Sequence, residues 1–137
     1  MTRQRFESLV AEAIQLIPRR FRREMTNLAV IVEDEPSPGL LREMEIEPPD
    51  TLFGLYQGIP LPERGAGHGN TLPDVITIYQ GPIEDECDGD EDDMRAVVGE
   101  TLIHEVGHYF GLSEEEIEAI EARYWRGTDG ENDGEDT

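Results

Sequence analysis

Two histidines and the glutamate beside the first of them are the residues of this sequence best suited to chemistry. In the stretch HEVGHYFGLSEEE, His104 and His108 stand four positions apart, so on a helix their imidazoles share one face, one turn above the other. Two such imidazoles can bind one cation, with Zn–N distances of about 2.0–2.1 Å. Glu105 points about a quarter-turn away, where its carboxylate can hold and deprotonate a metal-activated water. The alternative is a solvated histidine pair, because the H-E-x-x-H pattern also occurs by chance.

Apolar residues around the two histidines favour the metal site over that alternative. They are Val97, Val98, Leu102, Ile103, Val106, Tyr109 and Phe110. Their distribution predicts a helix from about residue 93 to residue 110 that is buried in the domain. Burying a glutamate and two histidines costs stability unless they are paired or bound to a metal.

The residues after the second histidine predict a bend that supplies a third ligand. Gly111 can end the helix in the left-handed conformation, and Ser113 with Glu116 has the pattern of a capping box at the start of a new helix. The bend brings the start of this helix back toward the histidines and presents Glu114. Two rival ligands lie nearby on the same helix, Glu115 and Glu118. The alternative role of Glu114 is that of a helix-start acid favoured by the helix dipole.

The stretch HEVGHYFGLSE follows H-E-x-x-H-x-x-G-x-x-[H/D/E], the long zinc signature of metzincin-like peptidases. The chain resembles the small bacterial minimal zincin-like metallopeptidases, and the similarity extends through VIVEDEP, GLYQGIPL and LPDVITIYQGPI. This resemblance implies Zn²⁺ bound by His104, His108 and Glu114. It also implies that Glu105 is the general base in the hydrolysis of peptide bonds. A His₂Glu set leaves the fourth position open for water, as in catalytic zinc sites.

The chain departs from the metzincins at two points. Its four methionines all precede the motif, so no methionine turn follows it, and a glutamate stands where the third histidine is usual. The sequence assigns no residue to transition-state stabilisation. Four side chains are candidate oxyanion donors, with loop or core positions as the alternative: His68, Tyr79, Tyr109 and Tyr124.

The rest of the sequence predicts the elements that position this motif. Apolar residues in RQRFESLVAEAIQLIP recur at the spacing of one helix face, and Pro18 stops that helix and opens a second, shorter one. Three strands are predicted, LAVIVEDEP, LFGLYQGIP and VITIYQGPI, and a last helix covers SEEEIEAIEARYW. Residues 36–50 are expected to form an exposed connection, and ERGAGHGNTLP and EDECDGDEDD are expected to form loops.

These elements predict an α+β fold with a small mixed sheet of about three strands, and the resemblance implies that this fold is zincin-like. N-terminal helices precede the sheet, the active-site helix packs beneath it, and a C-terminal helix follows. The domain is expected to span residues 1–126, followed by an acidic disordered tail over residues 127–137. We expect the strand VITIYQGPI at the sheet edge, where it can align an extended peptide by β-augmentation.

Composition restricts the partners and the location. The net charge of −21 at pH 7 repels phosphate backbones, so no nucleic-acid partner is expected. Cys87 is the only cysteine, and the acids around it raise the pKa of its thiol, which argues against a reactive nucleophile. No apolar run approaches membrane-spanning length and no secretory signal is visible. We therefore expect a soluble cytoplasmic protein with no membrane partner.

The expected function is that of a zinc-dependent metallopeptidase acting on a peptide or protein substrate. One alternative is a metal-dependent endoribonuclease, because a small bacterial rRNA-maturation family spaces three histidines as the motif spaces His104, His108 and Glu114. The other alternative is a non-catalytic, zinc-stabilised module that binds a protein partner, which the small size of the chain favours. Metal-dependent turnover of a peptide would distinguish these functions.

Overall fold

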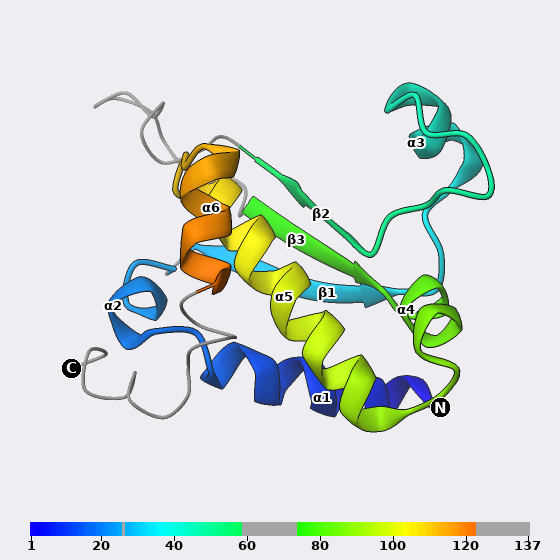
Figure 1. Cartoon of the computed structure of the whole chain (residues 1–137), viewed down its shortest axis with the longest axis horizontal. Helices are drawn as coiled ribbons and strands as arrows, with labels where there is room; N and C mark the ends of the chain where they lie inside the picture. Colours follow the sequence, from blue (N-terminus) through cyan, green and yellow to red (C-terminus); the bar gives the residue numbers. More distant parts are fainter. Residues whose placement is uncertain (26, 59–73, 123–137) are drawn as a thin grey trace.

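A three-stranded sheet and six helices make up the described part of the chain (Figure 1). The computed structural model describes residues 1–25, 27–58 and 74–122. In chain order the elements are α1 (Arg3–Gln15), α2 (Arg19–Arg22), β1 (Leu28–Glu33), α3 (Pro38–Glu43), β2 (Gly54–Gln57), β3 (Asp74–Tyr79), α4 (Gln80–Cys87), α5 (Glu91–Tyr109) and α6 (Glu114–Glu121). The α+β fold class predicted from the sequence is confirmed.

The sheet is mixed, and β3 is its central strand. The strand order is β1-β3-β2; β1 runs parallel to β3, with Leu28 opposite Asp74. β2 runs antiparallel to β3, with Gly54 opposite Ile78. The prediction that the strand VITIYQGPI lies at the sheet edge is therefore wrong. A nearly continuous apolar run is typical of a strand covered on both faces, and every residue of β3 except Val75 is buried.

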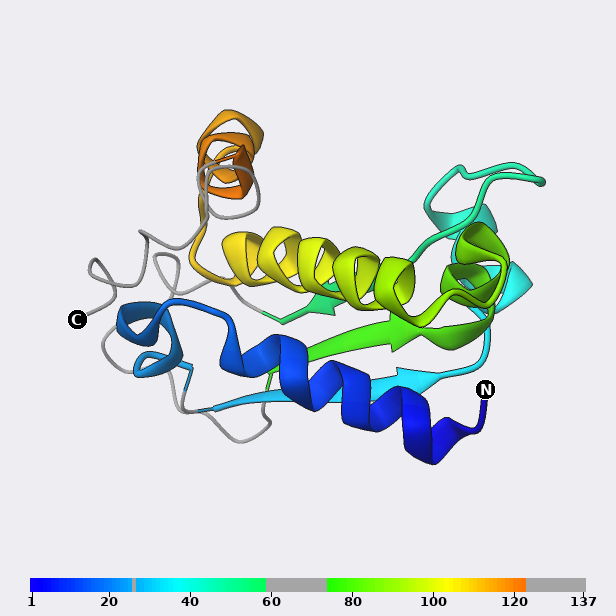
Figure 2. The same ribbon diagram turned by 60° about the horizontal axis from the view of Figure 1, so that its bottom comes forward.

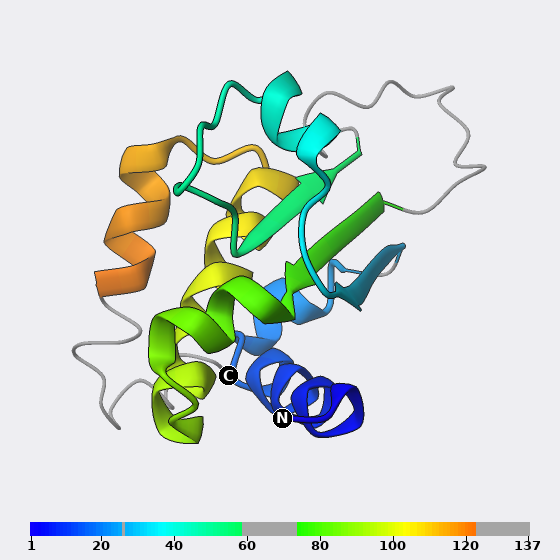
Figure 3. The ribbon, with the colours of Figure 1, turned by 90° about the vertical axis from the view of Figure 1, so that its right-hand side faces the viewer.

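Helices α1 and α5 lie side by side on one face of the sheet (Figures 2 and 3). α5 contacts α1, β2 and β3, so it is fixed by two layers at once. Apolar side chains of the helices and the sheet share one core, which includes Phe6, Leu9, Ile76, Ile78, Val98 and Leu102. Because close-packed side chains leave little room for movement, this core fixes the position of the helix that carries the histidines.

The acidic segment EDECDGDEDD was expected to form a loop. In the structure it contains the end of one helix and the start of the next. α4 begins directly after β3 and ends at Cys87, where Asp88 adopts a left-handed conformation with a φ of 50°. Asp90 then caps α5. The helix α4 was not predicted because Gly-Pro pairs usually end a strand or helix. Pro82 instead lies in the first turn of α4, where a backbone N–H has no hydrogen-bond partner within the helix, so the N–H that proline lacks is not needed.

Two other predicted segments differ in detail from the structure. Residues 36–50, expected to be an exposed connection, are mostly exposed but contain the short helix α3, whose N-cap Ser37 accepts a hydrogen bond from the backbone N–H of Leu40 at 3.0 Å. Pro18 is the N-cap of α2 and not its first helical residue. The predicted loop ERGAGHGNTLP, the domain boundary at residue 126 and the predicted tail lie outside the described residues. Across the described part of the chain, each helix is too short or too polar to cross a membrane.

Candidate metal centre

α5 is a long, capped helix that carries His104 and His108 on successive turns. At its start, the side chain of Asp90 accepts a hydrogen bond from the backbone N–H of Asp93 at 3.1 Å. The first turn of α5 also contains three acids, whose negative charges interact favourably with the positive, N-terminal end of the helix dipole. Near its other end the two imidazole rings lie with their centroids 4.8 Å apart and their planes at 78°. The predicted helical spacing thus brings both rings to one place.

Of the three motif residues, only the glutamate is buried. The side chains of His104 and His108 are 33% and 36% exposed, whereas that of Glu105 is 10% exposed. The prediction that both histidines are buried is therefore wrong. The reason is that the sheet and α1 cover one side of α5, while the histidines face α6 at a more open side. A solvent molecule can reach both rings.

A tight turn after His108 folds α6 back toward the histidines. Gly111 has a φ of 75°, a conformation that glycine adopts without strain. Its N–H donates to the carbonyl of His108 at 3.0 Å. The N–H of Leu112 donates to the carbonyl of Gly107 at 3.0 Å, which completes a Schellman motif. Ser113 caps α6 in a capping box. The bend and the capping box predicted from the sequence are confirmed.

A glycine between the two histidines lets α6 pack directly on α5. A Cβ atom on Gly107 would lie 2.5 Å from Cγ1 of Ile117, closer than two carbon atoms can approach without displacement. Ile117 is buried in this contact. The absence of a side chain at residue 107 therefore sets the distance between the two helices, and with it the distance from the α6 carboxylates to the histidines.

The carboxylate of Glu114 lies against the Nε2 atoms of both histidines. Its Oε2 is 3.0 Å from Nε2 of His108, and its Oε1 is 3.4 Å from Nε2 of His104. Glu114 is the first residue of α6, the position that the bend was predicted to deliver. Within the described part of the chain, neither Glu115 nor Glu118 forms an ion pair with a histidine.

Glu105 is held by the sheet as well as by its own helix. Its Oε1 accepts a hydrogen bond of 2.9 Å from the backbone N–H of Tyr56 in β2 and lies 3.2 Å from Nδ1 of His108. Burial raises the pKa of Glu105 above its ordinary value, although the charges of His108 and His104 oppose that shift. This carboxyl group can therefore hold a proton at a higher pH than an exposed glutamate does.

The contacts between His108 and Glu114 also shift the pKa values of these two groups. Burial lowers the pKa of His108, but its hydrogen bond to Glu114 and the charge of Glu105 outweigh that effect, so the pKa is raised. The same hydrogen bond lowers the pKa of Glu114. In the metal-free protein the pair therefore favours a charged imidazolium beside a charged carboxylate.

Three contributors to the site were not predicted from the sequence: Tyr56, Gly107 and Glu121. Oε2 of Glu121 lies 3.5 Å from Nδ1 of His104, and burial raises the pKa of Glu121. The sequence could have indicated Glu121, because it follows Glu114 by two helical turns and so lies on the same face of the predicted helix. The amide of Tyr56 had no signal, since any backbone N–H can donate and only the fold brings this one to Glu105.

The histidines and Glu105 form a group that could hold a metal ion. One ligand atom from each of His104, Glu105 and His108 can be chosen so that all three lie within 4.8 Å of one another. Imidazole nitrogens and carboxylate oxygens are ligands that zinc accepts at catalytic sites. The residue types present therefore suit the metal implied by the motif.

Of the four candidate oxyanion donors, the two in the described part of the chain, Tyr79 and Tyr109, have structural positions. Tyr109 is buried and donates its hydroxyl to the carbonyl of Glu24 at 3.2 Å, and Tyr79 is buried at the end of β3. Both therefore occupy structural positions, which was the alternative considered for them. His68 and Tyr124 lie outside the described residues.

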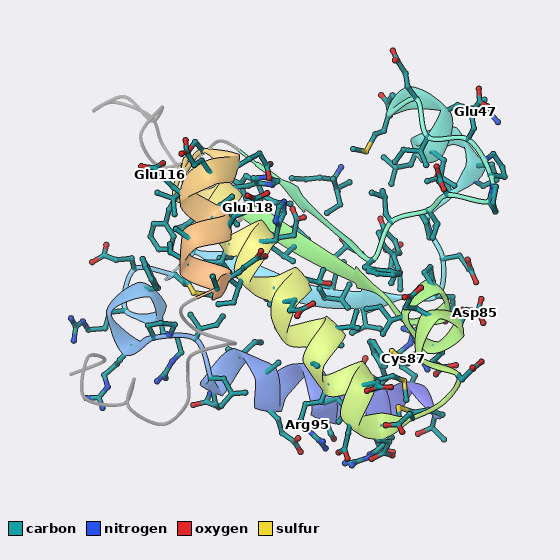
Figure 4. All side chains as sticks on the ribbon, viewed as in Figure 1. Glu47, Asp85, Cys87, Arg95, Glu116 and Glu118 are labelled. Atoms are coloured by element: carbon teal, nitrogen blue, oxygen red, sulfur yellow. The ribbon has the colours of Figure 1, made fainter. Side chains whose placement is uncertain are left out.

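A separate cavity of about 780 Å³ opens elsewhere on the molecule. Six carboxylate side chains are among the residues that line it: Glu35, Glu45, Glu47, Asp50, Asp85 and Glu86. Figure 4 labels Glu47 near α3 and Asp85 on α4, at the opposite end of the molecule from Glu116 and Glu118 of α6. This acidic cavity is thus distinct from the histidine cluster, and none of the candidate metal ligands lines it.

Comparison with known proteins defines the class to which this fold and site belong. The family model described as zincin-like metallopeptidase matches residues 25–124, a range that contains the sheet, α5 and α6. The chain therefore belongs to the zincin-like metallopeptidase family, whose fold is that of metal-dependent peptidases and which implies a metal, typically zinc.

The comparison with solved structures agrees with this fold. The chain is similar to a conserved hypothetical protein from Thermo thermophilus, with 28% sequence identity and a TM-score of 0.53. The match covers 89% of this chain and 99% of that one. None of the curated proteins matches the sequence.

Proposed function

We propose that the chain is a zinc-dependent metallopeptidase in which His104, His108 and Glu114 hold the metal and Glu105 is the general base. The observation that carries the proposal is the position of Glu114, whose two oxygens lie 3.4 Å and 3.0 Å from the Nε2 atoms of His104 and His108. Three ligands that converge in this way leave the fourth tetrahedral position free, as in catalytic zinc sites. Membership of the zincin-like family supports the same function.

Glu114 is a better third ligand than Glu105. Both carboxylates lie near His108, but Glu105 approaches its Nδ1 atom and is already held by the amide of Tyr56. Glu114 instead approaches the Nε2 atoms of both rings and is exposed at 64% of its side chain. It can therefore turn toward a cation without leaving a buried partner unsatisfied.

The reaction requires a group that accepts and returns a proton. A bound zinc ion would supply Lewis acidity, which polarises a peptide carbonyl and makes a nearby water more acidic. Glu105 takes the proton from that water and passes it to the leaving amine. Among the described residues both contacts of this carboxylate are made by Oε1, so we assign the proton transfer to Oε2. Burial raises the pKa of Glu105, which suits a group that must hold a proton for part of the cycle.

An extended peptide is the substrate that suits the strand next to the site. Because β3 is central, the sheet offers β2 as the edge strand on the side of α5. The backbone N–H of Tyr56 in β2 already points at Glu105, so a peptide lying along β2 passes close to the general base. In this proposal β2 takes the place of VITIYQGPI as the strand that aligns a substrate by β-augmentation.

Metal content and peptide turnover test this proposal together. We expect about one zinc per chain by elemental analysis of protein purified from zinc-replete cells. Cleavage of a diverse peptide pool, followed by mass spectrometry, should stop with a chelator and return with added zinc. His104→Ala and His108→Ala should lose tight zinc binding and also the rise in melting temperature that bound zinc provides.

Two results would overturn the metallopeptidase function. Wild-type protein without metal would exclude the zinc site altogether. Zinc-loaded protein that cleaves no peptide would favour a zinc-stabilised module that binds a protein partner.

A further inference from the structure

Each histidine of the cluster meets a different carboxylate at each of its two ring nitrogens. Nε2 of both rings faces Glu114. On the opposite side of the rings, Nδ1 of His108 lies 3.2 Å from Glu105, and Nδ1 of His104 lies 3.5 Å from Oε2 of Glu121. The two Nδ1 atoms thus have separate carboxylate partners, while the two Nε2 atoms share one.

This arrangement bears on which nitrogen of His104 carries the proton. A neutral imidazole has one N–H donor and one lone-pair acceptor, and the partner of one nitrogen decides the state of the other. A carboxylate at Nδ1 stabilises the proton there and leaves the lone pair on Nε2. Metal ligands commonly have such a carboxylate partner, whose loss weakens metal affinity by about 10- to 100-fold.

The place of Glu121 in the fold makes it suited to this task. It is the last residue of α6, two turns after Glu114 on the same face. The close contact between Gly107 and Ile117 holds α6 against α5. The side chain of Glu121 is 26% exposed, against 64% for that of Glu114, so Glu121 is the more enclosed of the two carboxylates.

We propose that Glu121 is a positioning residue for the metal centre. Its carboxylate accepts a hydrogen bond from Nδ1–H of His104, fixes the ring orientation, and keeps the Nε2 lone pair turned toward the side occupied by Glu114. This inference rests on the proposed zinc site and adds to it a residue outside the H-E-x-x-H-x-x-G-x-x-E motif. Glu105 has the matching position beside His108, but it also has the role of general base, so Glu121 is the carboxylate whose only assigned role is to orient a ligand.

The test compares Glu121→Ala and Glu121→Gln with Glu118→Ala, which removes an exposed carboxylate from the same helix. Zinc affinity is measured by competition with a chromophoric chelator. We expect Glu121→Ala to weaken it by about 10- to 100-fold, Glu118→Ala to leave it unchanged, and Glu121→Gln to fall between them because its amide oxygen can still accept a hydrogen bond. In the metal-free proteins, nitrogen chemical shifts of the imidazoles should show the Nδ1–H tautomer of His104 reduced in Glu121→Ala and unchanged in Glu118→Ala.

The outcomes separate this inference from the proposed function. If Glu121→Ala binds zinc as tightly as Glu118→Ala, or loses affinity with no change in the tautomer of His104, then Glu121 has no positioning role although the zinc site stands. If His104→Ala itself binds zinc as the wild type does, the proposed metal site is wrong. Should Glu121→Ala fail to fold, the tautomer and affinity of Glu121→Gln decide the matter, since glutamine keeps the size of the side chain.

Discussion

The backbone N–H of Tyr56 in β2 donates a hydrogen bond of 2.9 Å to Oε1 of Glu105 in α5. Tyr56 is itself fixed at its side chain, because its hydroxyl donates to Oδ2 of Asp74 at 2.7 Å and its ring packs edge-on against Tyr109 at a centroid distance of 5.9 Å. The orientation of the buried carboxylate thus depends on the sheet as well as on the helix that carries it.

Replacing Glu105 with glutamine separates an enzyme from a zinc-stabilised scaffold. Glutamine is nearly isosteric and still accepts the hydrogen bond from Tyr56, but it cannot accept a proton. We expect Glu105→Gln to retain zinc and to unfold at the same or a slightly higher temperature, because a buried charge is removed. Peptide cleavage should fall by at least about 100-fold, as expected for loss of a general base. The measurement compares cleavage rates at equal zinc occupancy, and equal rates in wild type and variant would falsify the role of Glu105.

Replacing Glu114 tests the third ligand. Because Glu114 lies against both Nε2 atoms and is proposed as a direct ligand, Glu114→Ala should weaken zinc affinity more than the loss of an outer-shell partner does, which costs about 10- to 100-fold. Glu115→Ala and Glu118→Ala are the matched controls, since they remove neighbouring exposed acids of α6, and each should change affinity little. Isothermal titration with zinc at constant pH gives the three values. A larger loss in Glu118→Ala than in Glu114→Ala contradicts the assigned ligand.

Adding a methyl group at residue 107 should disturb the site through α6. In Gly107→Ala the new Cβ lies 2.5 Å from Cγ1 of Ile117. Such overpacking destabilises a protein by about 1–3 kcal/mol. The higher helix propensity of alanine stabilises the helix by only about 1 kcal/mol, so we expect a net loss. We expect lower stability in urea unfolding and weaker zinc binding. Gly39→Ala in α3 is the control, because its Cβ has ordinary contacts at 3.8 Å or more. The double variant Gly107→Ala/Ile117→Ala should lose less stability than the sum of the losses in the two single variants. If the two losses simply add, the contact between residues 107 and 117 does not explain the effect.

Cys87 should be unreactive in the folded protein. Burial raises the pKa of its thiol, and the charges of Asp93 and Glu86 raise it further; the residue is 6% exposed. Alkylation by iodoacetamide near neutral pH is therefore expected to be at least about tenfold slower in buffer than in urea. The same shift affects stability, because above the ordinary thiol pKa of about 8.5 the unfolded chain releases a proton that the folded chain keeps. The raised pKa of Cys87 thus lowers the free energy of unfolding as pH rises above about 8.5, and it has no such effect at lower pH.

The control for this pH dependence is Cys87→Ala. Its free energy of unfolding should decline less steeply between neutral and alkaline pH than that of the wild type. Tyr79, whose pKa burial also raises, leaves a residual decline of the same sign. An identical decline in both proteins, or rapid alkylation of the folded chain, contradicts the burial of the thiol.

The parts of the site that depend on local geometry could be predicted from the sequence. Helical periodicity places His104 and His108 on one face, a glycine at residue 111 allows a left-handed turn, and Ser113 marks the next helix start. These features act within a few residues of one another, so spacing alone determines them. The roles of the two histidines, Glu105 and Glu114 in binding and catalysis remain predictions.

The parts that depend on packing could not be predicted. The sequence does not indicate which strand is central, because an apolar run such as that of β3 fits an edge and a centre until its neighbours are known. The exposure of the histidines depends on the angle at which α6 leaves the turn. α4 was missed because a Gly-Pro pair usually ends an element, although proline is tolerated in a first helical turn.

The hydrogen bond between Tyr56 and Glu105 also makes the orientation of Glu105 depend on a contact that is distant in sequence. The contacts of the histidines with Glu114 and Glu121 span only the turn between α5 and α6, whereas Tyr56 and Glu105 are 49 residues apart. Closing a longer loop costs more chain entropy. The proposed metal ligands thus meet through α5 and α6 alone, whereas Glu105 gains its amide partner only where β2 packs against α5. In the proposed enzyme, a chain that loses the docking of β2 can keep its metal ligands together and still lose the orientation of its general base.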